Sequence, residues 1–226
     1  MFSIVIPLYN EEKNIINLLY EIKTSLTKYN KYEIILVDDA SSDETLKIIN
    51  DHKNTKIKIF KNNVNTGQSY SITKGINNSS YDIIVTLDGD GQNDPKDIPK
   101  LLDLYFSLSS CKLVGGIRKK RMDNFIKIIS SRIANFIRSK ILNDDCKDTG
   151  CSLKVFDKNI FLKFPYFNGI HRFLPALFRG YGHRTDFIEV NHRIRKYGYS
   201  KYGTFIRLVR GIVDMFKVIN IIKNKN

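Results

Sequence analysis

The stretch "YDIIVTLDGDGQNDPKDIP", residues 81–99, passes from an apolar run into closely spaced aspartates. Its first part is β-branched and nearly continuous in apolar residues, which predicts a short strand covered on both faces. Asp88, Asp90 and Asp94 follow, and Pro95 then stands where a helix would begin. The order strand, turn, helix is the repeating unit of an α/β sheet.

The same unit recurs along the first half of the chain. Apolar and β-branched runs predict strands at residues 2–8, 32–39, 55–60 and 81–88. Amphipathic segments predict helices at residues 11–26, 41–50, 67–77 and 94–106. Regular alternation of strands and helices predicts a doubly wound, mostly parallel sheet.

Ligands of such sheets bind beyond the carboxyl ends of the strands, and here those ends are polar. The first strand runs into "PLYNE" (7–11), the second ends at Asp38 and Asp39, and the fourth at Asp88 and Asp90. Two carboxylates separated only by Gly89 can face one cation, and oxygen ligands suit Mg²⁺ or Mn²⁺. The alternatives are that Asp-Gly forms an ordinary turn and that the second pair caps the following helix.

The second half of the chain differs in kind. Residues 115–142 combine a glycine break, a basic cluster and a long amphipathic segment. Strands are predicted at 148–156 and 187–195, with a helical insert around 171–180. The tail, 202–223, spaces its polar residues by three or four and leaves a wide apolar face. We therefore expect a catalytic domain over 1–203 (halves 1–116 and 117–203) and a C-terminal amphipathic helix over 204–226.

The amino-acid composition limits the classes of function that fit this chain. Lys and Arg number 37 against 23 Asp and Glu, a net charge of +14, which favours an anionic partner such as nucleic acid, a phosphate-bearing substrate or an acidic lipid surface. A solvated lysine-rich surface is the alternative. Three cysteines without a CxxC pair and four scattered histidines argue for free thiols and against a zinc site. We expect no signal peptide and no membrane-spanning segment.

Several stretches together resemble glycosyltransferase family 2, which has the GT-A (Rossmann-like) fold, and in particular its dolichol-phosphate mannosyltransferase-like branch. These stretches are "SIVIPLYNEEKNI", "EIILVDDASSDET", "NTGQSYSITKGI", "VTLDGDGQNDPKDIP", "GGIRKKRMDNFIKIISSRIAN", "DTGCSLKVF", "HRFLPAL" and "VNHRIRKYGYSKYG". They cover nearly the whole chain in the order expected for the family.

The resemblance implies roles for individual residues. Nucleotide-sugar binding would fall to Pro7, Tyr9, Glu11, Asp38, Asp39, Gly67 and Gln68. The catalytic group would be Asp88, Asp90 and Asp148, with Mg²⁺ or Mn²⁺ held by Asp88, Asp90 and Gln92. The acceptor phosphate would be bound by Arg118, Lys127, Ser131, Arg132, Arg193, Arg195 and Lys201. Asp148 fits a sugar-binding or loop-ordering role, or a simple turn before Gly150, because a phosphate acceptor is already ionised and scarcely needs a base.

The function implied is inverting transfer of a hexose, mannose or glucose, from GDP-mannose or UDP-glucose to a dolichyl or undecaprenyl phosphate. The protein would act as a peripheral protein on the cytoplasmic face of an anionic membrane. A small integral membrane partner and an oligomeric state are left open. One alternative is a family 2 enzyme with a polysaccharide or other soluble acceptor. Another is a basic nucleic-acid-binding protein, although no nucleic-acid-binding motif is present.

Overall fold

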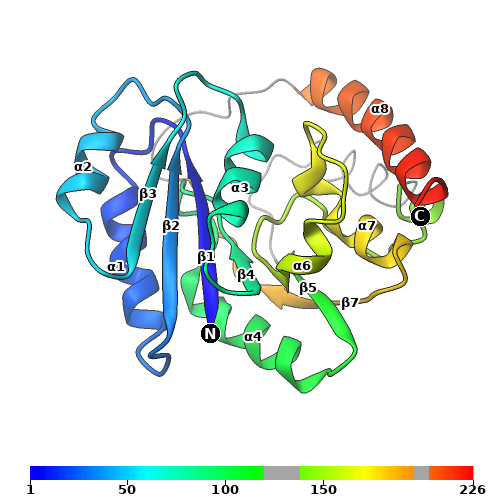
Figure 1. The fold of residues 1–226 in the computed structure, drawn as a ribbon, viewed down its shortest axis with the longest axis horizontal. Helices are drawn as coiled ribbons and strands as arrows, with labels where there is room; N and C mark the ends of the chain where they lie inside the picture. The colour runs from blue at the N-terminus through cyan, green and yellow to red at the C-terminus, as the bar shows by residue number, and fades with distance from the viewer. Residues whose placement is uncertain (120–137, 196–203, 226) are drawn as a thin grey trace.

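The computed structural model describes residues 1–119, 138–195 and 204–225. Its centre is a seven-stranded sheet with the strand order β3-β2-β1-β4-β6-β5-β7 (Figure 1). The strands are β1 (Phe2–Leu8), β2 (Tyr32–Asp38), β3 (Ile57–Lys61), β4 (Ile83–Thr86), β5 (Cys111–Arg118), β6 (Lys154–Asp157) and β7 (Arg184–Val190).

Most pairs of neighbouring strands are parallel, as predicted. β1 to β4 form one parallel group, and β5 is parallel to β7. β6 is antiparallel to both of its neighbours, β4 and β5. The predicted boundary between residues 116 and 117 falls within β5, so the two predicted halves contribute strands to one sheet.

The second-half strands are shorter than the sequence pattern indicates. β6 begins only at Lys154, and residues 148–153 form a loop before it. β7 ends at Val190, because the backbone N–H of Asn191 donates to Asp97 and that of Arg193 donates to the Gln92 carbonyl. The chain therefore leaves the sheet and crosses to the loop that follows β4.

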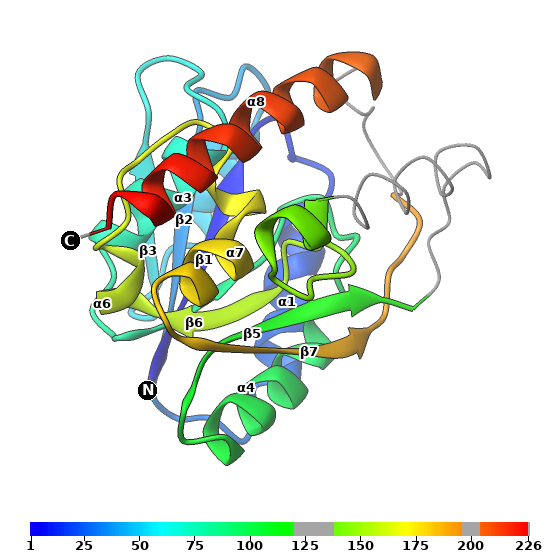
Figure 2. The ribbon, with the colours of Figure 1, turned by 90° about the vertical axis from the view of Figure 1, so that its right-hand side faces the viewer.

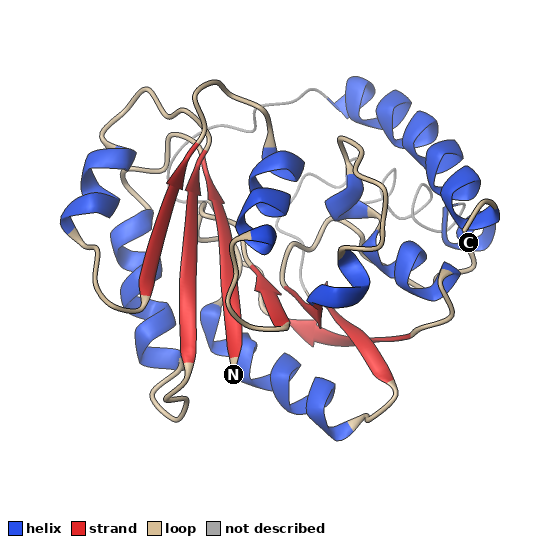
Figure 3. Cartoon of the chain, in the orientation of Figure 1, coloured by secondary structure: helices blue, strands red, loops and turns tan. Residues whose placement is uncertain are grey.

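Helices cover both faces of the sheet (Figure 3). One face packs on α1 (Ile15–Ser25), α2 (Thr45–Asp51) and α4 (Ile98–Ser107), the last preceded by the 3-10 turn η1 (Pro95–Asp97). The other face packs on α3 (Gln68–Asn77), α6 (Lys158–Phe161), η2 (Ile170–Arg172) and α7 (Leu174–Gly180). In β1, Ile4 and Ile6 enter the first core and Val5 enters the second, as expected from the alternation of side chains along a strand.

The predicted C-terminal helix is α8 (Thr204–Lys223), which lies along α7 (Figure 2). Met215 and Val218 are buried in the second core, and Asp214 is buried beneath Arg172. Ile212, Val213 and Phe216, which we term the α8 apolar patch, are 48%, 51% and 64% exposed. None of the helices among the described residues is both long and apolar enough to cross a bilayer.

Candidate functional site

The carboxyl ends of β1, β2 and β4 meet at one edge of the sheet, and the loops that follow them carry the predicted carboxylates. Asp38 is completely buried at the end of β2. Its Oδ2 accepts from the backbone N–H of Ser41 at 3.3 Å, whereas its buried Oδ1 has no partner among the described residues. A buried acceptor without a donor is costly, so this oxygen marks a place for a ligand or water donor.

Asp39 organises the loop between β3 and α3. Its carboxylate accepts hydrogen bonds from Asn62 Nδ2 (2.7 Å), Thr66 N (2.9 Å) and Gly67 N (2.7 Å). Burial alone would raise the pKa of Asp39, but these donors outweigh it and hold the pKa below its ordinary value. Gly67, which has a φ of +90°, is thereby held directly before α3, where Gln68 begins the helix.

The β1–α1 loop, which contains Tyr9, is tied to its neighbours around Glu11. Pro7 lies within β1, in register with Val37 of β2. The backbone N–H of Glu11 donates to Thr45 Oγ1 at 2.8 Å, and its carboxylate accepts from Asn14 Nδ2 at 2.7 Å. The Glu11 carboxylate is therefore buried and fixed at the edge of the site.

Asp88 and Asp90 lie in the turn directly after β4. A Cβ on Gly89 would lie 2.4 Å from Leu8 Cδ2 and 3.2 Å from the Pro7 carbonyl, so only glycine lets this turn approach the end of β1. The backbone N–H of Gln92 donates to Asp90 Oδ1 at 3.1 Å, and Gln68 Nε2 donates to Asp88 Oδ1 at 2.7 Å. The start of α3 therefore contacts the acidic turn.

The electrostatics of this turn suit a cation. Burial and the adjacent Asp90 carboxylate raise the pKa of Asp88 to about 6, against the opposing effect of Lys154 and Arg118. A positive ion beside the two carboxylates would favour the ionised form of Asp88, which burial and Asp90 disfavour. All the donors at this turn are hard oxygens, which fits Mg²⁺ or Mn²⁺.

Within the described residues no group of three or more His, Cys, Asp or Glu side chains is assembled for a metal. The remaining ligands of a cation at Asp88 and Asp90 would therefore come from water, substrate phosphates or Gln92. Mg²⁺ commonly binds in this way, through one or two carboxylates and several non-protein ligands.

Arg118 and Asp148, predicted separately for acceptor and sugar, form one buried pair. Arg118 Nε and Nη2 donate to the two Asp148 oxygens, each at 2.7 Å. Their side chains are 11% and 6% exposed. A Cβ on Gly150 would lie 2.8 Å from Arg118 Nη2, so the glycine makes room for the guanidinium.

Arg193 and Arg195 contact the same edge from the segment after β7. Arg195 Nη2 donates to Glu11 at 2.7 Å, and its Nη1 lies 3.7 Å from Asp90 Oδ2. Arg193 lies between Glu21 (2.6 Å) and Asp94 (2.7 Å). Arg195 thus reaches Glu11 and Asp90, two of the carboxylates predicted for the donor and the metal, whereas Arg193 pairs with carboxylates outside that set. The sequence predicted both arginines for the acceptor phosphate.

Four other residues predicted for the acceptor phosphate, Lys127, Ser131, Arg132 and Lys201, lie outside the described residues. Two residues that the sequence did not single out lie close to the acidic turn. Lys154, buried in β6, pairs in register with Thr86, two residues before Asp88, and its ammonium donates to the Cys151 carbonyl. His171 contacts Ser69 at the start of α3. The sequence signal for His171 is the "HRFLPAL" stretch, which supports the family resemblance and the predicted helical insert but does not assign His171 to the site.

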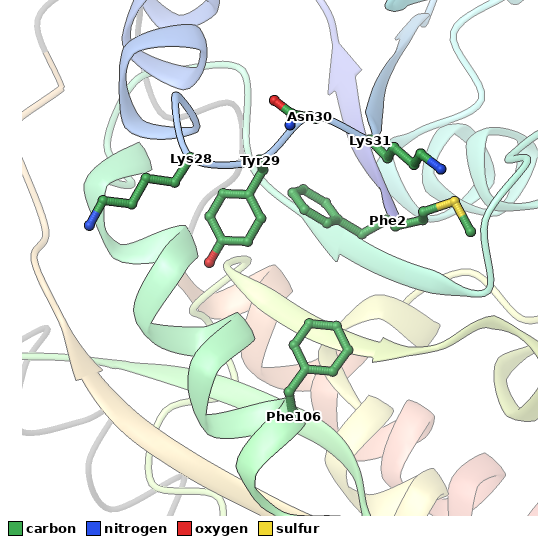
Figure 4. A pocket seen from close by; sticks show the side chains of 7 residues that line it. Phe2, Lys28, Tyr29, Asn30, Lys31 and Phe106 are labelled. Atoms are coloured by element: carbon green, nitrogen blue, oxygen red, sulfur yellow. The ribbon is translucent and has the colours of Figure 1, made fainter.

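One pocket lies elsewhere, at the amino ends of the strands, and has a different chemistry (Figure 4). Phe2, at the start of β1, and Lys31, before β2, help to line it, together with Met1, Lys28, Tyr29, Asn30 and Phe106. It contains no carboxylate and faces away from the loops that follow the strands. The acidic edge is therefore the candidate site.

Comparisons with known proteins agree with this geometry. Residues 3–165 match the family model for glycosyl transferase family 2. The chain is 34% identical to dodecaprenyl-phosphate galacturonate synthase of Rhizobium johnstonii, over 99% of this chain and 68% of that protein. It is also 34% identical to undecaprenyl-phosphate 4-deoxy-4-formamido-L-arabinose transferase of Proteus mirabilis, over 94% of this chain and 66% of that protein. The chain therefore spans about two thirds of the length of these relatives.

Solved structures show the same fold. Glucosyl-3-phosphoglycerate synthase from Mycobacterium tuberculosis in complex with phosphoglyceric acid matches with a TM-score of 0.75 and 16% identity, covering 98% of this chain and 80% of that one. The same enzyme with Mn²⁺, uridine diphosphate and phosphoglyceric acid matches with a TM-score of 0.73 and 14% identity, covering 100% and 79%. The fold is therefore that of the GT-A glycosyltransferases. This chain belongs to glycosyl transferase family 2, as its sequence resemblance predicted.

Proposed function

We propose that this protein transfers a sugar from a nucleotide sugar to a polyprenyl phosphate. The observation that carries the proposal is the pair Asp88 and Asp90 at the carboxyl edge of the sheet, with Arg195 3.7 Å from Asp90. A nucleoside diphosphate leaving group needs a cation, whereas a phosphate acceptor needs fixed positive side chains. The names of the relatives, which include polyprenyl-phosphate sugar transferases, support this choice of acceptor.

The donor side of the site is formed by the loops after β1, β2 and β4. Asp38 offers its buried Oδ1 to a donor group of the nucleoside, and Glu11 orients Arg195 toward the acidic turn. Asp88, Asp90 and Gln92 would hold Mg²⁺ or Mn²⁺. When bound, such an ion supplies Lewis-acid stabilisation to the departing diphosphate. Glucosyl-3-phosphoglycerate synthase from M. tuberculosis, which has the same fold, forms complexes with UDP that contain Mn²⁺ or Mg²⁺.

The acceptor side is proposed to centre on Arg118, held by Asp148. The paired carboxylate fixes the plane of the guanidinium, and a planar guanidinium held in one orientation suits the positioning of an incoming phosphate oxygen toward the sugar. The phosphate is already ionised near neutral pH, and attack therefore needs no general base. In this arrangement Asp148 acts by positioning Arg118.

The α8 apolar patch is proposed to contact the anionic membrane that carries the lipid acceptor. It lies on the solvent face of α8, while Met215 and Val218 on the opposite face anchor the helix to the core. Apolar side chains on a surface helix combined with a basic protein are typical of interfacial membrane binding. The cytoplasmic side and a hexose from GDP-mannose or UDP-glucose remain part of the proposal.

A nucleic-acid-binding function is less well supported by the positions of the arginines. Every arginine whose side chain the structure describes pairs with a carboxylate. A surface that binds the phosphate backbone would instead present arginines that have no carboxylate partner.

The decisive experiment incubates the purified protein with Mg²⁺ or Mn²⁺, a panel of nucleotide sugars and a polyprenyl phosphate. The expected product is a glycosylated polyprenyl phosphate, formed with one donor in strong preference to the others. Transfer to a polysaccharide or soluble phosphate acceptor, with none to the lipid, would instead establish the alternative acceptor class.

A further inference from the structure

A buried hydrogen-bond chain fixes one tautomer of His171. The backbone N–H of Gly169 donates to Ser69 Oγ at 2.8 Å, and Ser69 Oγ lies 2.7 Å from His171 Nδ1. Ser69 is completely buried. If His171 Nδ1 carried the proton, the Ser69 hydroxyl hydrogen would be buried without an acceptor among the described residues, which is unfavourable. The Ser69 hydroxyl therefore donates to Nδ1, and the imidazole proton resides on Nε2.

His171 is neutral as well as fixed. Burial and the nearby cations Arg172 and Lys154 lower the pKa of His171 to about 3. Its Nε2–H is therefore an uncharged donor at neutral pH. The side chain keeps some exposure to solvent, and the described residues offer Nε2 no hydrogen-bond partner. The side of the ring that carries Nδ1 is sealed by Ser69, and the Nε2 edge remains for a ligand.

The position of this donor links it to the acidic turn. Ser69 follows Gln68, which donates to Asp88 at 2.7 Å, so adjacent residues of α3 contact Asp88 and His171. The positive charge of Lys154, in β6, acts to lower the pKa of both Asp88 and His171. The start of α3 thus connects His171 to the carboxylates of the acidic turn.

We propose that His171 is a sugar-recognition residue whose neutral Nε2–H donates a hydrogen bond to an uncharged oxygen of the transferred sugar. The inference rests on the proposed function and deepens it. A diphosphate would be served better by a cation, and Arg195 already reaches that part of the site. A neutral donor suits a hydroxyl, ring or carbonyl oxygen. It would also select among donors, because a sugar without an acceptor there leaves a desolvated N–H unpaired.

The test compares each nucleotide sugar with its own nucleoside diphosphate: UDP-glucose with UDP, and GDP-mannose with GDP, all with Mg²⁺. The variants are His171→Leu, which removes the donor, and His171→Gln, whose amide can replace Nε2–H. His52→Leu, at an exposed site after α2, is the control. For His171→Leu we expect affinity for the nucleotide sugar to fall by about tenfold or more, with nucleoside diphosphate affinity within about twofold of the parent. His171→Gln should recover much of the loss.

Equal losses for the sugar and the nucleoside diphosphate, or no loss for either, would overturn the assignment. If the hydrogen bond between Ser69 and His171 served only to hold η2 against α3, His171→Leu would lower the affinity for the nucleotide sugar and for the nucleoside diphosphate equally. It would also lower the melting temperature. These binding measurements need no acceptor, so failure of lipid transfer would refute the proposed function without affecting this test.

A second measurement is independent of any donor. Long-range ¹H–¹⁵N spectra of the ¹⁵N-labelled protein should show His171 as the Nε2–H tautomer, without titration between about pH 5 and pH 8. In Ser69→Ala, His171 should no longer prefer the Nε2–H tautomer. A protonated Nδ1, or titration of the ring in that range in the parent protein, would refute the inference even if neither nucleoside diphosphate bound.

Discussion

Arg118 and Asp148, thirty residues apart, meet through two parallel hydrogen bonds of 2.7 Å, and both side chains are nearly buried. A bidentate pair fixes the plane of the guanidinium as well as its position. Removing one partner would leave the other as an unpaired buried charge. The role of Arg118 is therefore best tested by a change that preserves its charge.

Arg118→Lys keeps a cation but loses the planar fork. We expect kcat/KM for the polyprenyl phosphate to fall by about ten- to a hundredfold, while nucleotide-sugar affinity changes little. Steady-state kinetics with varied lipid phosphate, beside calorimetric donor binding, would measure both. Arg184→Lys, in an exposed pair with Asp186, is the matched control. Loss of donor affinity with normal acceptor kinetics would place Arg118 on the donor diphosphate instead.

Asp90→Asn should abolish most activity and leave the fold intact, because the proposed metal ligand supports chemistry more than packing. We expect turnover to fall by at least about a hundredfold, with a melting temperature close to that of the parent. Asp103→Asn, an exposed carboxylate on α4, is the control. Metal-dependent binding of the nucleoside diphosphate should disappear in the first variant alone. Parent-level turnover in Asp90→Asn, or full activity with excess chelator, would exclude the metal role.

Gly89→Ala tests the close approach of the acidic turn to β1. The added Cβ would lie 2.4 Å from Leu8 Cδ2, so we expect a loss of about 1–3 kcal/mol in the free energy of unfolding. Gly211→Ala in α8, where no neighbouring atom lies within 4 Å, should be neutral or stabilising. Chemical denaturation measures both. Leu8→Ala combined with Gly89→Ala should cost less than the sum of the two single changes, and strict additivity would contradict the proposed clash.

The lowered pKa of Asp39 predicts that the protein loses part of its folding stability in acid. Its pKa is lower in the folded protein than in the unfolded chain, so the unfolded state binds more protons as the pH falls. The stabilisation is complete above the ordinary Asp pKa of about 3.9 and is lost as the pH falls through the lower folded value. Asp39→Asn should therefore be less stable than the parent at pH 7 by roughly 1.5–3 kcal/mol, and the difference should shrink in acid. A stability difference that is constant with pH would contradict this origin.

The α8 apolar patch can be tested without removing the helix. Deleting α8 would uncover the core around Val218, so truncation confounds membrane binding with unfolding. A triple change of Ile212, Val213 and Phe216 to serine should weaken flotation with anionic vesicles by about tenfold or more and leave the melting temperature nearly unchanged. Val218→Ser, on the buried face, should lower stability instead. Undiminished flotation of the triple variant would show that the patch is not the membrane contact.

The parts of the site that could be predicted from sequence are those that follow directly from strand ends. Asp38, Asp88 and Asp90 each stand at the end of an apolar run, and parallel strands bring such ends together. Side-chain partners from distant segments could not be predicted in this way. Arg195 and Glu11 are 184 residues apart, and Ser69 and His171 are 102 apart. No local periodicity encodes these contacts, which depend on how the loops pack.

The fold can likewise be divided into parts that were predictable from local sequence and parts that were not. Alternating strands and helices in the first half predicted a parallel sheet, because their hydrophobic periods are unambiguous. The limits of β6 and β7 were predicted less well. Residues 148–153 contain apolar positions typical of a strand, but they form a loop in which Asp148 binds Arg118. A tertiary ion pair thus overrides local β-propensity there.

The antiparallel strand β6 has a consequence for the order in which the chain folds. It lies between β4 and β5, yet it is synthesised after both. While the ribosome still holds residues 154–157, β4 can pair on its β1 side alone, and its other edge stays unpaired in the nascent chain. Pairing across such a sequence separation is slow, because a long loop must close first. We therefore expect fragments that stop before residue 154 to aggregate through that edge, and a separately supplied C-terminal fragment to rescue them by complementation.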